Sequence, residues 1–203
     1  MAKQTLGGLA PAAAILAAIF AWLYAVSFVV LKNPALFSAF LAVGGLLSVA
    51  VFVELHQRLA GILSGAAMLA LILGALAAFG SLAHGGYDLA YALHPVALPP
   101  GAGDLPSSTD PRGLATFGLA GLAILVWSGA ILHSGAFSRG LGWLGILSGI
   151  LLLLIYLARL VILDAAHPAV LVPALIEGFL VSPVWYLWLG VSLLQRPRLF
   201  QPL

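Results

Sequence analysis

Two ionisable residues stand inside long apolar runs in the C-terminal third of the chain. Arg159 lies in the run 141–163, and Glu177 lies in the run 170–194, which follows after a short loop. Charged side chains are costly in hydrocarbon, so those that persist there pair with each other, line a cavity or take part in chemistry. Counted from the loop, both residues lie about one to two helical turns inside their runs. We therefore predict an intramembrane ion pair between Arg159 and Glu177.

Arg159 is expected to point into a helix bundle. Its helical face also contains Gly145, Ser148 and Leu152, of which the first two are small. Two alternatives to a structural pair stay open. Arg159 can reach the membrane surface or Asp164 instead, and the two charges can form an ion, proton or ligand site.

Pro183 lies near the middle of the run 170–194 and is predicted to kink its helix. A proline inside a helix removes one backbone donor, which here leaves the carbonyl group of Phe179 without its helical partner. A neighbouring helix or the Ser182 hydroxyl can satisfy such a carbonyl within a membrane. We expect a static kink, and a gating hinge is the alternative.

Three aromatic residues, Trp185, Tyr186 and Trp188, follow the proline. Aromatic side chains commonly gather at the membrane–water interface, so a membrane belt or packing within the bundle is the main prediction for them. A surface that binds a lipid, a quinone or a pigment is the alternative. No other cofactor is predicted.

Four residues form a weak candidate for a site that binds a divalent metal ion. His84 and Asp88 are four residues apart, so they share one helical face, and His94 or His167 would complete the ligand set. Helix caps or interfacial histidines are the simpler interpretation. The sequence contains no GxSxG, HExxH or Walker pattern, so no catalytic residue is predicted and the chain is not expected to be an enzyme.

The composition is that of a polytopic membrane protein. The 203 residues are 63% hydrophobic and only 7% charged, with a mean hydropathy of +1.17, whereas soluble domains have about 25% charged residues. The isoelectric point of 9.2 does not indicate a nucleic-acid partner, because the eight Lys and Arg residues form no basic stripe. The absence of cysteine excludes disulfides and thiolate chemistry.

Six apolar runs reach the length of about 20 residues that a membrane-spanning helix needs. They cover residues 9–31, 35–53, 59–83, 113–132, 141–163 and 170–194. We predict an all-α bundle of six transmembrane helices in one domain of residues 1–203. Lys32, Asn33 and Pro34 mark the first boundary and residues 54–58 the second, and the residues 84–112 form a long extracytoplasmic loop.

The basic residues indicate how the chain is oriented. Those on the side of the two termini are Lys3, Arg58, Arg139, Arg196 and Arg198, against Lys32 and Arg112 in the opposite loops. The positive-inside rule therefore places both termini in the cytoplasm. A bacterial inner membrane is the expected location.

The segment 138–145 reads Ser-Arg-Gly-Leu-Gly-Trp-Leu-Gly and precedes an apolar helix, an outer loop and a helix with proline and glutamate that ends in Trp188-Leu189. In these features the chain resembles the uncharacterised bacterial membrane family catalogued as domain of unknown function 4386, chiefly over residues 133–194. The resemblance implies a six-span fold and a glutamate of interest, here Glu177, but no activity. The spacing from Glu177 to Trp188 is longer than in the family pattern.

These features favour a non-enzymatic integral membrane protein that acts as an accessory or structural subunit of a larger membrane complex. Its expected partners are membrane lipids and other membrane protein chains. A small ion- or proton-coupled transporter with its site at Arg159 and Glu177 is one alternative, and a lipid-, quinone- or pigment-binding module is another. A water-filled cavity that reaches Glu177 would favour transport, whereas a dry, tightly packed pair would favour a structural role.

Overall fold

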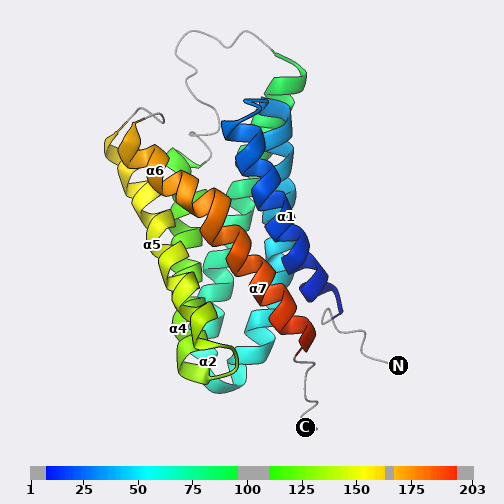
Figure 1. The fold of residues 1–203 in the computed structure, drawn as a ribbon, viewed down its shortest axis with the longest axis vertical. Helices are drawn as coiled ribbons and strands as arrows, with labels where there is room; N and C mark the ends of the chain where they lie inside the picture. The colour runs from blue at the N-terminus through cyan, green and yellow to red at the C-terminus, as the bar shows by residue number, and fades with distance from the viewer. Residues whose placement is uncertain (1–7, 96–109, 163–166, 196–203) are drawn as a thin grey trace.

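The computed structural model describes residues 8–95, 110–162 and 167–195, which are mostly helical (Figure 1). The α-helices are α1 (Leu9–Val29), α2 (Pro34–Leu93), α4 (Ala120–Ser134), α5 (Arg139–Val161), α6 (Pro168–Ile176) and α7 (Ser182–Gln195). The 3₁₀ turn η2 (Pro111–Gly113) and the π-helix η3 (Leu114–Leu119) precede α4, and the π-helix η4 (Glu177–Val181) joins α6 to α7. These described ranges contain no strand, so the all-α prediction is confirmed for them.

Five helical stretches of the described chain are long and apolar enough to cross a membrane. They are Leu9–Val29, Pro34–Leu93, Pro111–Ser134, Arg139–Val161 and Pro168–Gln195. Large apolar side chains stand on their outer surface, including Phe79 at 64% exposure and Val161 at 83% exposure. Such a surface is unfavourable in water and favourable in lipid, which is consistent with an integral membrane protein.

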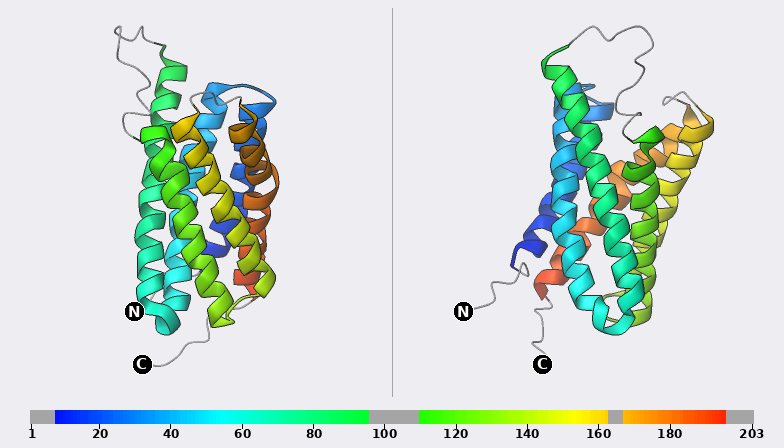
Figure 2. Two further views of the ribbon diagram at one scale, coloured as in Figure 1. Left: turned by 90° about the vertical axis from the view of Figure 1, so that its left-hand side faces the viewer. Right: turned by 180° about the vertical axis from the view of Figure 1, so that it is seen from behind.

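α2 folds back on itself at Leu63. A straight helix of 60 residues would be about 90 Å long, which is about three times the thickness of the hydrocarbon core. The backbone of Leu63 leaves the helical region (φ −140°, ψ 61°), and two antiparallel limbs extend from it (Figure 2). Phe52 packs on Gly74 near the bend, and the Ser38 carbonyl lies against Gly85 at the far end. The second and third predicted runs therefore form one helical hairpin.

The turn before α2 has the predicted form. The side chain of Asn33 caps α2 by accepting a hydrogen bond from the amide of Leu36 at 3.1 Å. Pro34 occupies the first helical turn, where an amide would lack a helical partner in any case.

The other boundaries of α2 differ from the prediction. Residues 54–58 lie inside the first limb, since the bend comes only at Leu63. The second limb continues through His84 to Leu93, so the predicted loop at 84–112 is helical over its first part. Within these stretches Glu54 pairs with Arg58, and His84 lies near Asp88.

Glu54 forms a buried polar contact within the first limb of α2. It is fully buried, and its Oε1 atom accepts a hydrogen bond from Nε of Arg58 at 2.8 Å. Nη2 of Arg58 also donates to the carbonyl of Leu193 at 3.5 Å, near the end of α7. Carbonyl groups at a helix C-terminus carry partial negative charge, so the guanidinium stabilises them and ties α7 to the first limb of α2.

One carboxylate fixes the start of the helical stretch that begins at Pro111. Asp110 is buried and accepts hydrogen bonds from the Ala115 amide at 2.6 Å, the Thr116 amide at 3.1 Å and the Thr116 hydroxyl at 2.6 Å. A carboxylate at a helix N-terminus satisfies free amides and interacts favourably with the helix dipole. Asp110 thereby sets where η3 begins.

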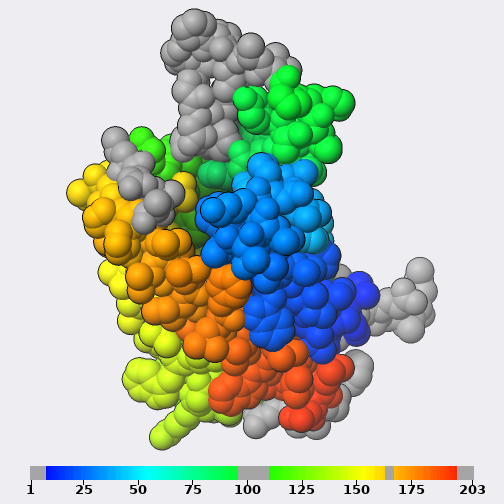
Figure 3. Space-filling view, turned by 45° about the horizontal axis from the view of Figure 1, so that its top comes forward, coloured from blue at the N-terminus to red at the C-terminus, as the bar shows by residue number. Residues whose placement is uncertain are grey.

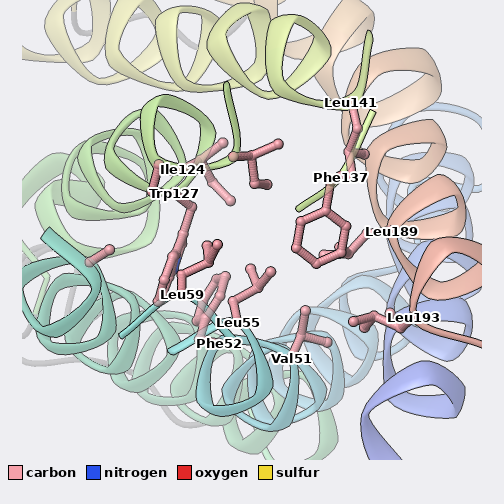
Figure 4. Close-up of a cluster of buried hydrophobic side chains, with 14 of the residues drawn as sticks. Val51, Phe52, Leu55, Leu59, Ile124, Trp127, Phe137, Leu141, Leu189 and Leu193 are labelled. Carbon is pink, nitrogen blue, oxygen red and sulfur yellow. The ribbon is translucent and has the colours of Figure 1, made fainter. Parts of the chain in front are cut away.

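The main hydrophobic core lies between α2, α4, α5 and α7 (Figure 4). Side chains from these helices point toward one another there, including Phe52, Leu55, Leu59, Ile124, Trp127, Leu141 and Leu189. α4 and α5 approach closely at Gly121 and Gly149, because a methyl group on either glycine would lie within 3 Å of the carbonyl oxygen of the other: 2.9 Å and 2.8 Å. Small residues permit such contacts in membrane bundles.

α1 packs against the rest of the bundle through small residues. Its buried face includes Ala10, Ala13, Ala14, Ala17 and Ala18, and Gly190 of α7 lies against Pro11 and Ile15. Figure 3 shows the surface of α1 (blue) in contact with η4 and α7 (orange to red). The start of α1 and the end of α7 lie at the same end of the bundle (Figure 1).

Candidate functional site

A cavity of about 250 Å³ lies within the bundle, lined by α1, both limbs of α2, η3, α4, α5, α6, η4 and α7. Apolar walls with a few polar groups are typical of sites that bind small molecules. The polar side chains on this wall are Tyr24, Ser48, Ser81, Thr116, Ser148, Arg159, Glu177, Ser182 and Tyr186. Of the described residues that line the cavity, Arg159 and Glu177 carry charge.

Glu177 is the buried carboxyl group of the cavity. Its exposed fraction is 4%, and its Oε1 atom accepts a hydrogen bond of 2.6 Å from the Ser148 hydroxyl of α5. Its Oε2 atom is buried and has no hydrogen-bond partner. A carboxylate oxygen in apolar surroundings costs free energy unless a donor or a cation accompanies it. The geometry therefore leaves one buried carboxyl oxygen without a hydrogen-bond partner in a residue that lines the cavity.

The backbone around Glu177 departs from the α-helix. Glu177 begins the π-helix η4, and Pro183 lies in the first turn of α7. The carbonyl of Phe179, which the proline deprives of its usual partner, accepts a hydrogen bond of 2.8 Å from Nε1 of Trp22 in α1. This confirms the expectation that a neighbouring helix satisfies the freed carbonyl. π-helical segments in α-helices are frequent at functional sites.

Arg159 lies at a different level of the cavity. It follows Ser148 by eleven residues in α5, which is about 16 Å along the helix axis. Its guanidinium carbon is 5.2 Å from the centre of the Phe117 ring, a cation–π contact. The prediction that Arg159 points into the bundle with Ser148 and Leu152 is confirmed, because all three line the cavity.

The predicted ion pair between Arg159 and Glu177 is not formed in the described part of the chain. The recorded ion pairs there involve Glu54, Asp88 and Asp110, and Glu177 binds Ser148 instead. The reason is depth. Arg159 lies two residues before the end of α5, whereas Glu177 lies nine residues after the start of α6, so it is about 13 Å along its own helix. Asp164, the alternative partner of Arg159, lies outside the described residues.

The three aromatic residues after Pro183 lie in three different environments. Trp185 is fully buried in the hydrophobic core, and Trp188 is 41% exposed and lies against Gly140. Tyr186 lines the cavity, with its ring edge-on to Trp185 at 5.0 Å. Of the predicted ligand surface, therefore, Tyr186 alone reaches the cavity.

The weak metal candidate is not assembled by the described residues. His84 Nε2 lies 3.7 Å from Asp88, as their spacing predicts, and its Nδ1 lies 3.9 Å from Asp110. His94 ends α2, and His167 caps α6 by accepting a hydrogen bond from the amide of Ala169. The described ranges contain no group of three His, Cys, Asp or Glu residues that could hold a metal ion.

One wall of the cavity is aromatic, and it was not predicted from the sequence. Phe20, Tyr24 and Phe28 of α1 recur every four residues and all line the cavity, together with Phe40 of α2. Phe20 and Phe40 meet edge to face, with ring centres 5.6 Å apart. The four-residue spacing was the available signal, since it places three rings on one face of a helix.

Comparisons with known proteins give no match. No family model matches the sequence, and neither the curated proteins nor the solved structures contain a match. The family resemblance of residues 133–194 thus stays a prediction.

Proposed function

We propose that this chain is a six-span protein of a bacterial inner membrane that binds a small amphipathic molecule inside its helix bundle. The two limbs of α2, antiparallel from Leu63 onward, would supply two of the six spans. Each limb contains about 30 residues, which is enough to cross the hydrocarbon core. With six spans both termini lie on one side, and the basic residues favour the cytoplasm.

The observation that carries the binding function is the Oε2 atom of Glu177. It is buried, it has no hydrogen-bond partner, and its residue lines a cavity with apolar walls. Ionisable residues within membrane bundles commonly mark ligand or ion pathways. A bound molecule with a donor group would satisfy Oε2 while its apolar part contacts the walls.

The cavity also bears on the alternatives raised by the sequence. A cavity that reaches Glu177 favours binding or transport over a dry structural pair. An accessory role in a larger complex stays a prediction.

Native mass spectrometry of the full chain, released from membranes, tests the binding function. The wild type should retain a small molecule. Gly44→Leu should lose it, because the substitution adds a side chain at the cavity wall. A Cβ atom on residue 44 would lie 3.9 Å from its nearest neighbouring atom. Gly129→Leu on α4 is the matched control, because nothing lies within 4 Å of that glycine. Equal retention by both variants would contradict the proposal.

Transport of the same molecule is a second candidate, favoured by the π-helical segment that begins at Glu177. Such segments within α-helices are frequent at functional sites. Uptake into proteoliposomes by the wild type, lost in Gly44→Leu and kept in Gly129→Leu, would support transport. Binding without uptake would limit the function to binding.

A further inference from the structure

We infer that the ligand is a small lipophilic amine in its protonated form, held with its ammonium group at Glu177. This inference rests on the proposed function and adds the chemical class of the bound molecule. Its starting point is the pairing of the Glu177 carboxylate: Ser148 occupies Oε1 at 2.6 Å, while Oε2 has no partner. An ammonium N–H donates to a carboxylate oxygen with a short and strong bond.

The distribution of charge in the cavity favours a cation at this position. Glu177 is 4% exposed, and the other charge on the wall, Arg159, lies about 16 Å further along α5 than Ser148. Arg159 is placed over the Phe117 ring, close to the end of α5. The carboxyl group at the level of Ser148 therefore has no cation beside it among the described lining residues, and an ammonium ion would stabilise its ionised form.

The walls suit an amine that carries an aromatic or other apolar group. Tyr186 lines the same cavity as Glu177, and the rings of Phe20, Tyr24 and Phe40 form part of the cavity wall. Aromatic faces attract cations, and desolvated sites strengthen this attraction. The volume of about 250 Å³ corresponds to about eight water molecules. A molecule of one ring and a short chain fits this space.

Three probes of nearly equal shape separate charge from hydrogen bonding and from apolar contact. They are 2-phenylethylammonium, 2-phenylethanol and propylbenzene, which differ only in an ammonium, a hydroxyl or a methyl group at the end of the chain. Binding of tritiated 2-phenylethylammonium to the full chain in nanodiscs is measured at neutral pH, and the two neutral compounds are added as competitors. Glu177→Gln, which keeps the shape of the side chain, and Gly129→Leu serve as test and control variants.

We expect 2-phenylethylammonium to bind the wild type and Gly129→Leu alike. Glu177→Gln should bind it at least about tenfold more weakly, since a buried charge pair is lost. Both neutral probes should compete at least about tenfold more weakly than the unlabelled amine. Should Glu177→Gln fail to fold, the comparison of the three probes on the wild type decides alone.

Two results would overturn the inference, and only the second would also reject the proposed function. Equal competition by 2-phenylethanol or propylbenzene would reject an ammonium ligand but leave the cavity as a binding site for neutral molecules. Absence of binding by all three probes, together with equal retention of native molecules by Gly44→Leu and Gly129→Leu, would reject the proposed function as well.

Discussion

Two adjacent glycines in the second limb of α2 provide a sharp test of the helical hairpin. A methyl group on Gly85 would lie 2.5 Å from the carbonyl oxygen of Ser38 and 2.9 Å from the amide nitrogen of Ala42. Both atoms belong to the backbone of the first limb, so neither can rotate out of the way. At Gly86 nothing lies within 4 Å, and that position is exposed.

The magnitudes follow from two opposing effects. Replacing glycine by alanine inside a helix stabilises it by about 1 kcal/mol, and this gain is common to both positions. Overpacking at Gly85 costs about 1–3 kcal/mol, because the two limbs must move apart. We expect Gly86→Ala to raise the free energy of unfolding by up to about 1 kcal/mol. Gly85→Ala should be less stable than Gly86→Ala by about 1–3 kcal/mol.

Equilibrium unfolding of the two variants in mixed detergent micelles measures this difference. Because both substitutions are identical and adjacent, effects on the unfolded chain cancel in the comparison. If Gly85→Ala and Gly86→Ala were equally stable, the close approach of the two limbs at Ser38 would be refuted, and with it the hairpin.

Three further substitutions can be measured in the same assay. Asp110→Ala should cost about 2 kcal/mol, since it removes the acceptor of three hydrogen bonds at the start of η3; an unchanged midpoint would show that the cap is dispensable. Trp22→Phe should cost about 1 kcal/mol, because the carbonyl of Phe179 loses its donor, and a neutral result would mean that another group takes over. Glu54→Ala should cost about 3 kcal/mol by leaving Arg58 without its carboxylate, and stability equal to the wild type would argue against the pair.

The helical membrane fold could be predicted because composition and run length depend on the chain alone. The need of the Phe179 carbonyl for a donor was also predictable, since the loss of an amide is a local effect. That the donor is Trp22 depends on how α1 packs against η4, which no local pattern specifies.

The partners of the charged residues could not be predicted, because they too depend on how the helices pack. Glu54 was taken for a helix boundary because it is charged, but Arg58 one turn later makes its burial tolerable. The relative depth of Arg159 and Glu177 was misjudged because α5 ends at Val161 and α6 begins at Pro168, each two residues earlier than predicted. Sequence spacing did place Ser148 on the inward face, where it meets Glu177.

The most direct test of the central claim is an infrared difference spectrum of the carboxyl groups on ligand binding. The chain has only six Asp and Glu residues, so the band of a single buried carboxyl can be assigned by substitution. Addition of 2-phenylethylammonium to the wild type should shift one carboxyl band, and the shift should be absent in Glu177→Gln. A bound ligand that leaves every carboxyl band unchanged, or the same shift in both proteins, would contradict the assignment of Glu177 as the binding group of the cavity.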